Sequence, residues 1–385
     1  MAQNSFSHAV IRGISAVVPP QEIRLEDELE YFGGDIKKAR RMTKIAGLDR
    51  RRVAEPGILP SDLCRQAAEG LFAGLELDPA SVDAVIFVSQ CPDYAMPATA
   101  CILQDALGLP KSCAAFDVNQ GCTGYVYGLW LASSLVESGA CSRVLLLEGD
   151  GLTRLYDNDN RVVAPVFGDC GTATLVERSL KERPSWFVLG TDGSGAEVLM
   201  VPAGRGRLPL PPTQEEYAPY CERLYDPQGM PWRLNRTWMD GGAVFEFTLA
   251  VVPEHIRELL RYAGKTQEDI DYLVPHQANR QIMQAVAERA GFPLEKTLME
   301  AFSKYGNLAG ASIPSAICDE LPEKGVGKRT LLLSGFGVGL SWASAIITTE
   351  NLWLSGVRDY VKPAGHPRPE DILAHWRKKI TGKAL

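Results

Sequence analysis

Short apolar runs alternate with longer amphipathic segments along most of this chain. In the first half, residues 84–88, 114–118 and 143–147 are apolar enough to be buried strands. Between the last two runs, residues 122–138 place apolar side chains at helical spacing around much of the helix surface, which predicts a helix buried on several sides. Continuous apolar strands joined by crossover helices are typical of a layered α/β fold.

The second half of the chain repeats the alternation. Residues 270–274 and 329–333 predict strands, and residues 279–290 predict a helix between them. A closing strand is predicted over residues 342–347. Because strand–helix–strand recurs with a polar or reactive residue at each strand end, we expect two similar halves that share one core.

Two segments fall outside this alternation. Residues 204–236 are rich in Pro, Gly and Tyr and show no clean period, so we expect a long loop that is functional or mobile. Residues 350–385 contain several prolines followed by a helix-like pattern over 370–380, and we expect a C-terminal extension that docks on the fold without chemistry. The rest of the chain divides into halves at 1–180 and 181–349.

Composition and charge exclude several classes of function. The chain has 385 residues, with 40 Lys and Arg against 47 Asp and Glu, so its net charge is −7. Nucleic-acid binding needs clustered basic residues, and the one dense basic run, at 37–41, is typical of a solvated helix face, so we expect no nucleic-acid partner. No stretch approaches the roughly 18 consecutive apolar residues of a membrane helix, so we expect no membrane partner. Nine cysteines are too sparse for a disulfide scaffold, which predicts reduced cysteines and a cytoplasmic location. They form no C-x-x-C pair or Cys/His cluster, so we expect no metal site.

Cys122 is the most informative single residue. A strand is predicted to end at Val118, the chain turns at Gly121, and a helix begins near Cys122. A thiol at a helix N-terminus faces unpaired N–H groups and the positive end of the helix dipole, which lower its pKa and can stabilise an oxyanion. Cys122 is therefore a candidate nucleophile, and a buried structural cysteine is the alternative.

Two polar residues of the second half are further candidates. His276 is one of five histidines and the one predicted at a strand end, where α/β folds place their chemistry. Asn307 lies in a glycine-flanked turn that leads into a helix. His276 could instead be a core histidine with satisfied hydrogen bonds, and Asn307 an ordinary turn asparagine. Sequence spacing does not prove that the two side chains lie close together in the fold.

Five segments together resemble the thiolase-fold condensing enzymes, specifically β-ketoacyl-acyl-carrier-protein synthase III. The segments are, in chain order, residues 117–124, 167–173, 274–279, 306–314 and 335–342. The resemblance spans nearly the whole chain. It implies a thiolase-like fold, in which two similar α/β halves pack as a five-layer αβαβα core, and a homodimer. The nucleophile would then lie in the half 1–180, and the histidine and asparagine in the half 181–349.

The resemblance also implies roles for the candidate residues. Cys122 would accept an acyl group from a thioester, and the backbone N–H groups of Cys122 and Val338 would form the oxyanion hole. His276 and Asn307 would donate hydrogen bonds to the enolate oxygen that forms when a malonyl-type or β-ketoacyl thioester reacts. An asparagine rather than a carboxylate at position 307 favours decarboxylative formation of a C–C bond.

The implied substrates are acyl-coenzyme A and acyl-carrier-protein thioesters, with no further cofactor. Arg161 and Asn279 match residues on the coenzyme A side of the family's site, and Phe245 is also expected to bind substrate. Met96 matches the residue that the family's partner subunit inserts at the floor of the acyl pocket. The tryptophan and arginine that usually enclose the adenine are not in place in residues 41–47. These departures favour a specialised enzyme of secondary metabolism or of a fatty-acid pathway.

Three alternatives stay open at this point. An acyltransferase of the same fold would move the acyl group from Cys122 to an alcohol or amine. A cysteine hydrolase would use the same order of Cys, His and Asn, although the residues that surround the papain-type cysteine are absent. A non-catalytic partner subunit would be expected to lose the cysteine, which this chain retains.

Overall fold

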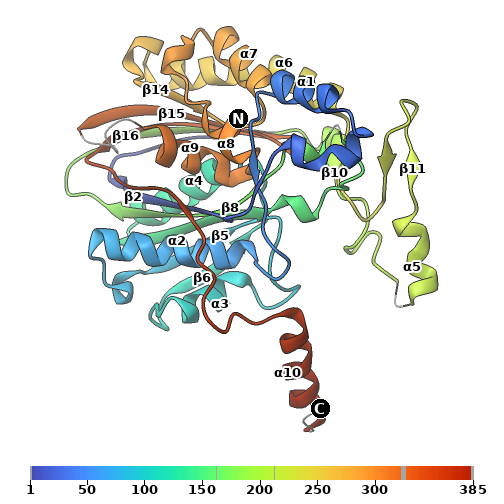
Figure 1. Cartoon of the computed structure of the whole chain (residues 1–385). Helices are drawn as coiled ribbons and strands as arrows, with labels where there is room; N and C mark the ends of the chain where they lie inside the picture. The colour runs from blue at the N-terminus through green and yellow to red at the C-terminus, as the bar shows by residue number, and fades with distance from the viewer. Residues whose placement is uncertain (1, 162, 212, 322–326, 383–385) are drawn as a thin grey trace.

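Two stacked β-sheets organise the protein, with helices between them and on both outer faces (Figure 1). The computed structural model describes residues 2–161, 163–211, 213–321 and 327–382. The six-stranded sheet has the order β17-β2-β8-β7-β5-β6, and the five-stranded sheet has the order β1-β9-β16-β15-β14. The layered α/β class predicted from the strand and helix pattern, and the five-layer arrangement that the resemblance implies, are confirmed.

The strands and helices have the following bounds. The six-stranded sheet contains β17 (Trp353–Asp359), β2 (Ala9–Val18), β8 (Asp169–Arg178), β7 (Arg143–Gly151), β5 (Ala84–Val88) and β6 (Ala114–Val118). The five-stranded sheet contains β1 (Ala2–Phe6), β9 (Ser185–Thr191), β16 (Ser341–Glu350), β15 (Lys328–Gly337) and β14 (Tyr272–Pro275). The outer layers contain α2 (Pro60–Leu75) and α3 (Thr99–Ala106) on one side, and α6 (Gly241–Ala263) and α7 (Arg280–Ala290) on the other. The middle layer contains α4 (Gly124–Glu137), α8 (Ala301–Tyr305) and α9 (Ser312–Glu320).

Helix α4 lies between the two sheets and carries the main core. Its side chains Tyr125, Val126 and Leu129 are almost fully buried and belong to a cluster that includes residues of both sheets. Burial of each large apolar side chain contributes about 1.5–3 kcal/mol. The prediction of a helix buried on several sides over residues 122–138 is therefore confirmed, with the regular helix beginning two residues after Cys122.

Parallel strand pairing brings the candidate residues to one place. Strands β5, β6 and β7 run parallel, so the segments that leave their C-terminal ends lie at one edge of the six-stranded sheet. Cys122 follows β6. Strands β14 and β15 are also parallel, and His276 and Val338 follow them directly. The C-terminal ends of parallel strands are where α/β folds place their sites.

Two expectations about the first sheet are corrected. Strand β6 is at the sheet edge, so Ala114 is exposed and the other residues of β6 are half-buried rather than buried. The extension expected over residues 350–385 begins with β17, which pairs in parallel with β2 and buries Leu354. The apolar start of this segment completes a sheet edge, and Tyr360 directly after β17 is also buried in the core, so only the later part is an appendage; residues 383–385 lie outside the described residues.

Residues 204–236 have more regular structure than expected. They contain α5 (Gln214–Cys221) and the short hairpin of β11 (Leu224–Tyr225) and β12 (Pro231–Trp232). Just beyond them, β13 (Trp238–Met239) pairs with β10 (Leu199–Met200). In Figure 1 this lobe lies to one side of the layered core, next to β10.

Candidate active site

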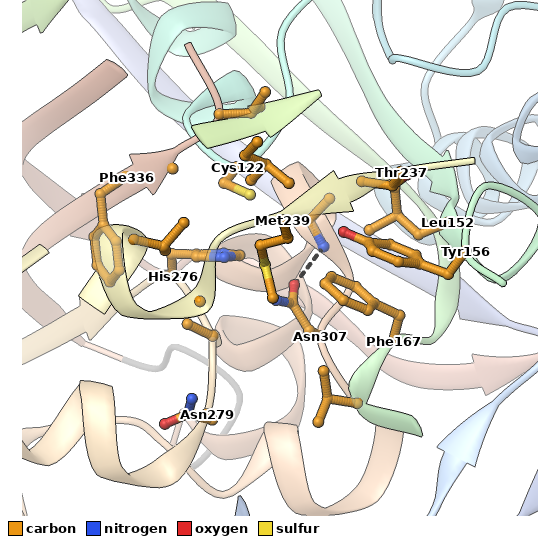
Figure 2. A pocket seen from close by; sticks show the side chains of 18 of the residues that line it. Cys122, Leu152, Tyr156, Phe167, Thr237, Met239, His276, Asn279, Asn307 and Phe336 are labelled. Atoms are coloured by element: carbon orange, nitrogen blue, oxygen red, sulfur yellow. Dashed lines mark hydrogen bonds between the residues drawn. The ribbon is translucent and has the colours of Figure 1, made fainter. Parts of the chain in front are cut away.

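A cavity of about 230 Å³ opens beside Cys122 at the junction of the two halves. Cys122, His276 and Asn307 all line it, and Figure 2 shows their side chains around one common space. The structure therefore brings together the three residues that the sequence analysis selected. Among the described residues, no group of three His, Cys, Asp or Glu side chains is placed to hold a metal ion, and no helix is long and apolar enough to cross a membrane.

Close packing holds the turn that carries Cys122. Gly121 lies against Gln90, since a Cβ at this glycine would be 2.4 Å from Gln90 Oε1. Gly337, at the end of β15, has a φ of 152° and lies directly over the thiol; a Cβ there would be 2.8 Å from Cys122 Cβ. Only a glycine leaves room for the Cys122 side chain at this contact.

The thiol of Cys122 differs from the sequence expectation. Part of the residue faces the cavity, but protein atoms surround the sulfur, and this burial raises the pKa of Cys122 to about 12. The backbone N–H groups of Val338 and Cys122 oppose the shift, and the charge of Asp150 adds to it. The expected lowering of the pKa by the helix N-terminus is thus outweighed by desolvation. The resting residue is a thiol.

His276 is buried and held by a serine that the sequence analysis did not single out. Its Nδ1 lies 2.8 Å from Ser312 Oγ, which also accepts a hydrogen bond from the Gln277 backbone N–H at 3.3 Å. Burial lowers the pKa of His276 to about 4. The imidazole is therefore neutral near pH 7 and can donate one N–H without carrying charge. Ser312 lies in the same motif as Asn307, residues 306–314, and this shared motif was the sequence signal that could have identified Ser312 as a site residue.

Asn307 is oriented by backbone contacts on several sides. Its backbone N–H donates to the Val166 carbonyl at 2.7 Å, and its own carbonyl accepts from the Gly168 N–H at 3.0 Å. Its side-chain oxygen accepts from the Ala309 N–H at 3.0 Å, the dashed line in Figure 2. Because the amide oxygen is held by a donor, the amide NH₂ group is the end left for the cavity.

Two of the four expected substrate-binding residues line the cavity. Phe245 is 41% exposed and marks its mouth, and Asn279 lies at the start of α7, where its side chain accepts the Ile282 N–H at 2.8 Å. Met96 is 83% exposed and does not line the cavity of its own chain.

Arg161 is engaged inside its own chain instead of facing the cavity. Its guanidinium binds Glu28 at 2.7 Å and packs over the ring of Tyr31 at 4.7 Å. The same carboxylate binds Arg51 at 2.6 Å, so Glu28 joins two buried arginines. The sequence analysis placed Arg161 on the coenzyme A side of the site; in the structure one guanidinium nitrogen binds Glu28, 133 positions earlier in the chain, and another donates to the Asn158 carbonyl at 3.0 Å.

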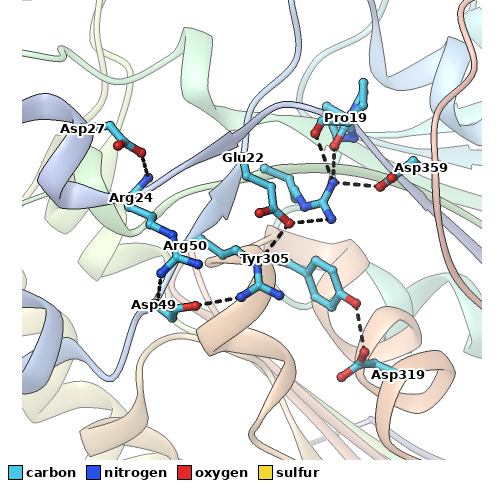
Figure 3. A network of polar contacts seen from close by, with 11 residues as sticks. Pro19, Glu22, Arg24, Asp27, Asp49, Arg50, Tyr305, Asp319 and Asp359 are labelled. Atoms are coloured by element: carbon cyan, nitrogen blue, oxygen red, sulfur yellow. Dashed lines mark hydrogen bonds and ion pairs between the residues drawn. The ribbon is translucent and has the colours of Figure 1, made fainter.

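The neighbouring segment is held by further ion pairs (Figure 3). Arg50 binds Glu22 at 3.0 Å and Asp49 at 2.7 Å, and Asp49 also binds Arg24 at 2.6 Å. Exposed pairs of this kind each contribute little stability. They connect residues 22–24, just before Glu28 in the chain, to residues 49–50.

Sequence reasoning missed the inner wall of the cavity. Leu152 and Phe167 form an apolar surface there, and Tyr156 stacks on Phe167 with ring centroids 4.0 Å apart. Gln90, at the end of β5, lines the cavity beside Cys122. None of the described residues that line the cavity is charged.

Comparisons with known proteins agree on one family. Residues 116–195 match the family model described as 3-oxoacyl-[acyl-carrier-protein] synthase III, and residues 260–349 match the model of its C-terminal part. A putative 3-oxoacyl-[acyl-carrier-protein] synthase 3 of Campylobacter jejuni is 35% identical over 93% of this chain and 98% of its own length.

Solved structures give the same result. The crystal structure of a 3-oxoacyl-(acyl-carrier protein) synthase from Burkholderia xenovorans is 37% identical, with a TM-score of 0.85 over 93% of this chain and 99% of that chain. The priming β-ketosynthase of the R1128 polyketide pathway is 26% identical, with a TM-score of 0.76 over 90% of this chain and 97% of that chain.

Proposed function

The chain belongs to the 3-oxoacyl-[acyl-carrier-protein] synthase III family, and we propose that it carries an acyl group on Cys122 and extends it by decarboxylative Claisen condensation. It is an acyltransferase of the condensing type. One observation supports this reaction most directly: a thiol, a neutral imidazole and an amide NH₂ surround a cavity whose described lining contains no charged side chain.

In the first step, Cys122 Sγ attacks the carbonyl of an acyl thioester. The new S–C bond forms, the old one breaks, and the leaving thiolate takes up the proton that Cys122 loses. The N–H groups of Cys122 and Val338 are the two backbone donors that lower the pKa of the Cys122 thiol, so they lie close to the reacting atoms. We assign them as the oxyanion hole; a donor of this kind contributes about 3 kcal/mol to the transition state.

In the second step, a malonyl-type thioester loses CO₂ and leaves an enolate. The enolate carbon attacks the acyl group on Cys122, and the cysteine departs as a thiolate. His276 and Asn307 would each donate a hydrogen bond to the enolate oxygen. No carboxylate base is needed, because breaking the C–C bond to CO₂ supplies the carbanion, and the described lining offers none.

The alternative product, an ester or amide, needs a base to deprotonate an alcohol or amine. The neutral, amide-bearing lining does not favour that reaction. The condensing reaction is therefore preferred over acyl transfer to oxygen or nitrogen.

The donor and the partner subunit are further proposals. Arg161 is already bound to Glu28, which favours acyl-carrier-protein thioesters over coenzyme A thioesters as primers. A homodimer is expected because β6 leaves one sheet edge half-exposed, and the loop ending at Thr99, which carries Met96, is bonded to Asp117 of that strand. No cofactor beyond the thioesters is proposed, and the cytoplasmic location stays a prediction.

The test is the intact mass of the protein after incubation with acyl thioesters. Wild type should gain the mass of one acyl group, and Cys122→Ala should gain none. Addition of a malonyl thioester should then release CO₂ and a β-ketoacyl product. Loading of the Cys122→Ala variant, or a product with an ester or amide but no new C–C bond, would contradict the proposal. Sedimentation of the wild type gives the oligomeric state.

A further inference from the structure

The inner end of the cavity contains two polar groups that nothing in the described chain satisfies. Tyr156 is only 7% exposed, yet its hydroxyl has no hydrogen-bond partner among the described residues. The side-chain amide of Gln90 also has none, and its oxygen lies against Gly121, next to Cys122. Both side chains line the cavity.

The position of Tyr156 is fixed by packing. Its ring stacks on Phe167 with an interplanar angle of 12°, so the ring has little freedom to turn its hydroxyl away. In Figure 2, Tyr156 lies with Leu152 and Phe167 on the side of the cavity opposite Asn279. Phe245 marks the mouth by its exposure, so Tyr156 and Leu152, which are buried, mark the inner end.

Other polar groups nearby are already satisfied. The Thr237 hydroxyl donates to the Leu155 carbonyl at 3.2 Å, and the Asn307 side-chain oxygen accepts from the Ala309 N–H. The backbone N–H of Gln90 donates to Asp150 at 2.8 Å. Apart from the groups already assigned to the reaction, the Tyr156 hydroxyl and the Gln90 amide are therefore the polar groups of the described lining that the chain leaves open at the inner end.

We propose that the acyl group carried by Cys122 bears an uncharged oxygen, as a hydroxyl or a ketone, that hydrogen-bonds Tyr156 and Gln90. Both groups face the open cavity, where water can bind them; a saturated chain that displaces this water leaves them without a partner, which costs free energy, whereas an acyl oxygen supplies the partner. Sites that bond a substrate oxygen discriminate strongly against the analogue that lacks it. A carboxylate is not the expected group, because no described lining residue is a cation and Asp150 lies behind Gln90.

This inference rests on the proposed function, because it describes the acyl group loaded on Cys122. The test compares the loading rates of wild type with butanoyl, 3-hydroxybutanoyl and 3-oxobutanoyl esters of the same small thiol, followed by intact mass. The 3-hydroxybutanoyl and 3-oxobutanoyl esters show whether the site prefers a hydroxyl or a ketone oxygen. Wild type should load at least one of them about tenfold faster than butanoyl, the effect of one buried hydrogen bond.

The variants test the residues. Tyr156→Phe keeps the stacked ring and removes the oxygen, so the ratio of oxygenated to saturated loading should fall about tenfold. Gln90→Leu should lower the same ratio. Tyr127→Phe is the matched control, because the Tyr127 hydroxyl pairs with Thr191 and does not line the cavity; its ratio should equal that of wild type.

Equal loading of all three esters by wild type would overturn the inference and leave the proposed function intact. Equal slowing of all three esters in Tyr156→Phe would also overturn the inference, because the Tyr156 hydroxyl would then have only a structural role. If wild type loads none of these esters and no carrier-bound ester either, the proposed function fails, and the inference fails with it.

Discussion

Replacement of Gly337 by alanine is the sharpest test of how the nucleophile is held. The new Cβ would lie 2.8 Å from Cys122 Cβ and 2.9 Å from Cys122 Sγ, whereas nonbonded carbon atoms pack best at about 3.5–4.0 Å. The backbone φ of 152° also favours glycine. The Cys122 backbone is itself closely packed, because its carbonyl oxygen lies 2.9 Å from where a Cβ on Gly335 would stand.

The expected cost follows from these contacts. Overpacking typically costs about 1–3 kcal/mol and an unfavourable backbone conformation about 1–3 kcal/mol, so Gly337→Ala should lose about 2–6 kcal/mol. A domain stable by about 5–15 kcal/mol survives this with a lower melting temperature. A shift of the thiol by about 1 Å should slow acyl loading about 100-fold.

Intact-mass kinetics of loading and a thermal melt, run in parallel, give both quantities. Gly190→Ala is the control: its Cβ would lie 2.4 Å from the indole of Trp342, away from the cavity, so it should melt earlier but load normally. Wild-type loading and melting of Gly337→Ala would refute the argument that this contact positions Cys122.

Further expectations concern the other site residues and the appendage. Asn307→Ala should slow CO₂ release from a malonyl thioester about 100-fold and acyl loading much less; an equal loss in both steps would contradict its role at the enolate. Because burial lowers the pKa of His276 to about 4, the neutral ring contributes stability above its ordinary value near 6.5 that is lost as the pH falls towards 4; urea midpoints at pH 7 and pH 5 should differ less in His276→Phe than in wild type. Glu28→Gln should lose about 3 kcal/mol, because two buried arginines lose their carboxylate, and an unchanged urea midpoint would show that water replaces it. Deletion of residues 368–385 removes α10 (Pro369–Thr381), which buries no side chain, and keeps His366, whose Nε2 lies 3.1 Å from the Gly57 carbonyl, so the melting temperature should not change; a large decrease would show that α10 packs on a second copy.

Much of the fold was predictable because it is encoded locally. The runs 84–88 and 114–118 form β5 and β6 with the expected bounds, and the segment after β6 carries Cys122, which the motif analysis selected. Parallel strand pairing places Cys122 and His276 at the C-terminal ends of their strands, whereas Asn307 follows α8 and is held by backbone bonds to Val166 and Gly168. Strand patterns, glycine turns and helix starts depend on neighbours a few residues away, and the sequence displays those neighbours directly.

The properties of the site depended on distant neighbours. The pKa of Cys122 is raised because packed atoms desolvate its thiol, while the helix N-terminus visible in the sequence would lower it. Arg161 is bound by Glu28, and β17 completes a sheet that begins near residue 9. The unsatisfied hydroxyl of Tyr156 appears only when the walls of the cavity are in place. Desolvation and hydrogen-bond satisfaction depend on all atoms around a group, whatever their distance along the chain, so the sequence determined which residues meet and the tertiary structure decided their charge and availability.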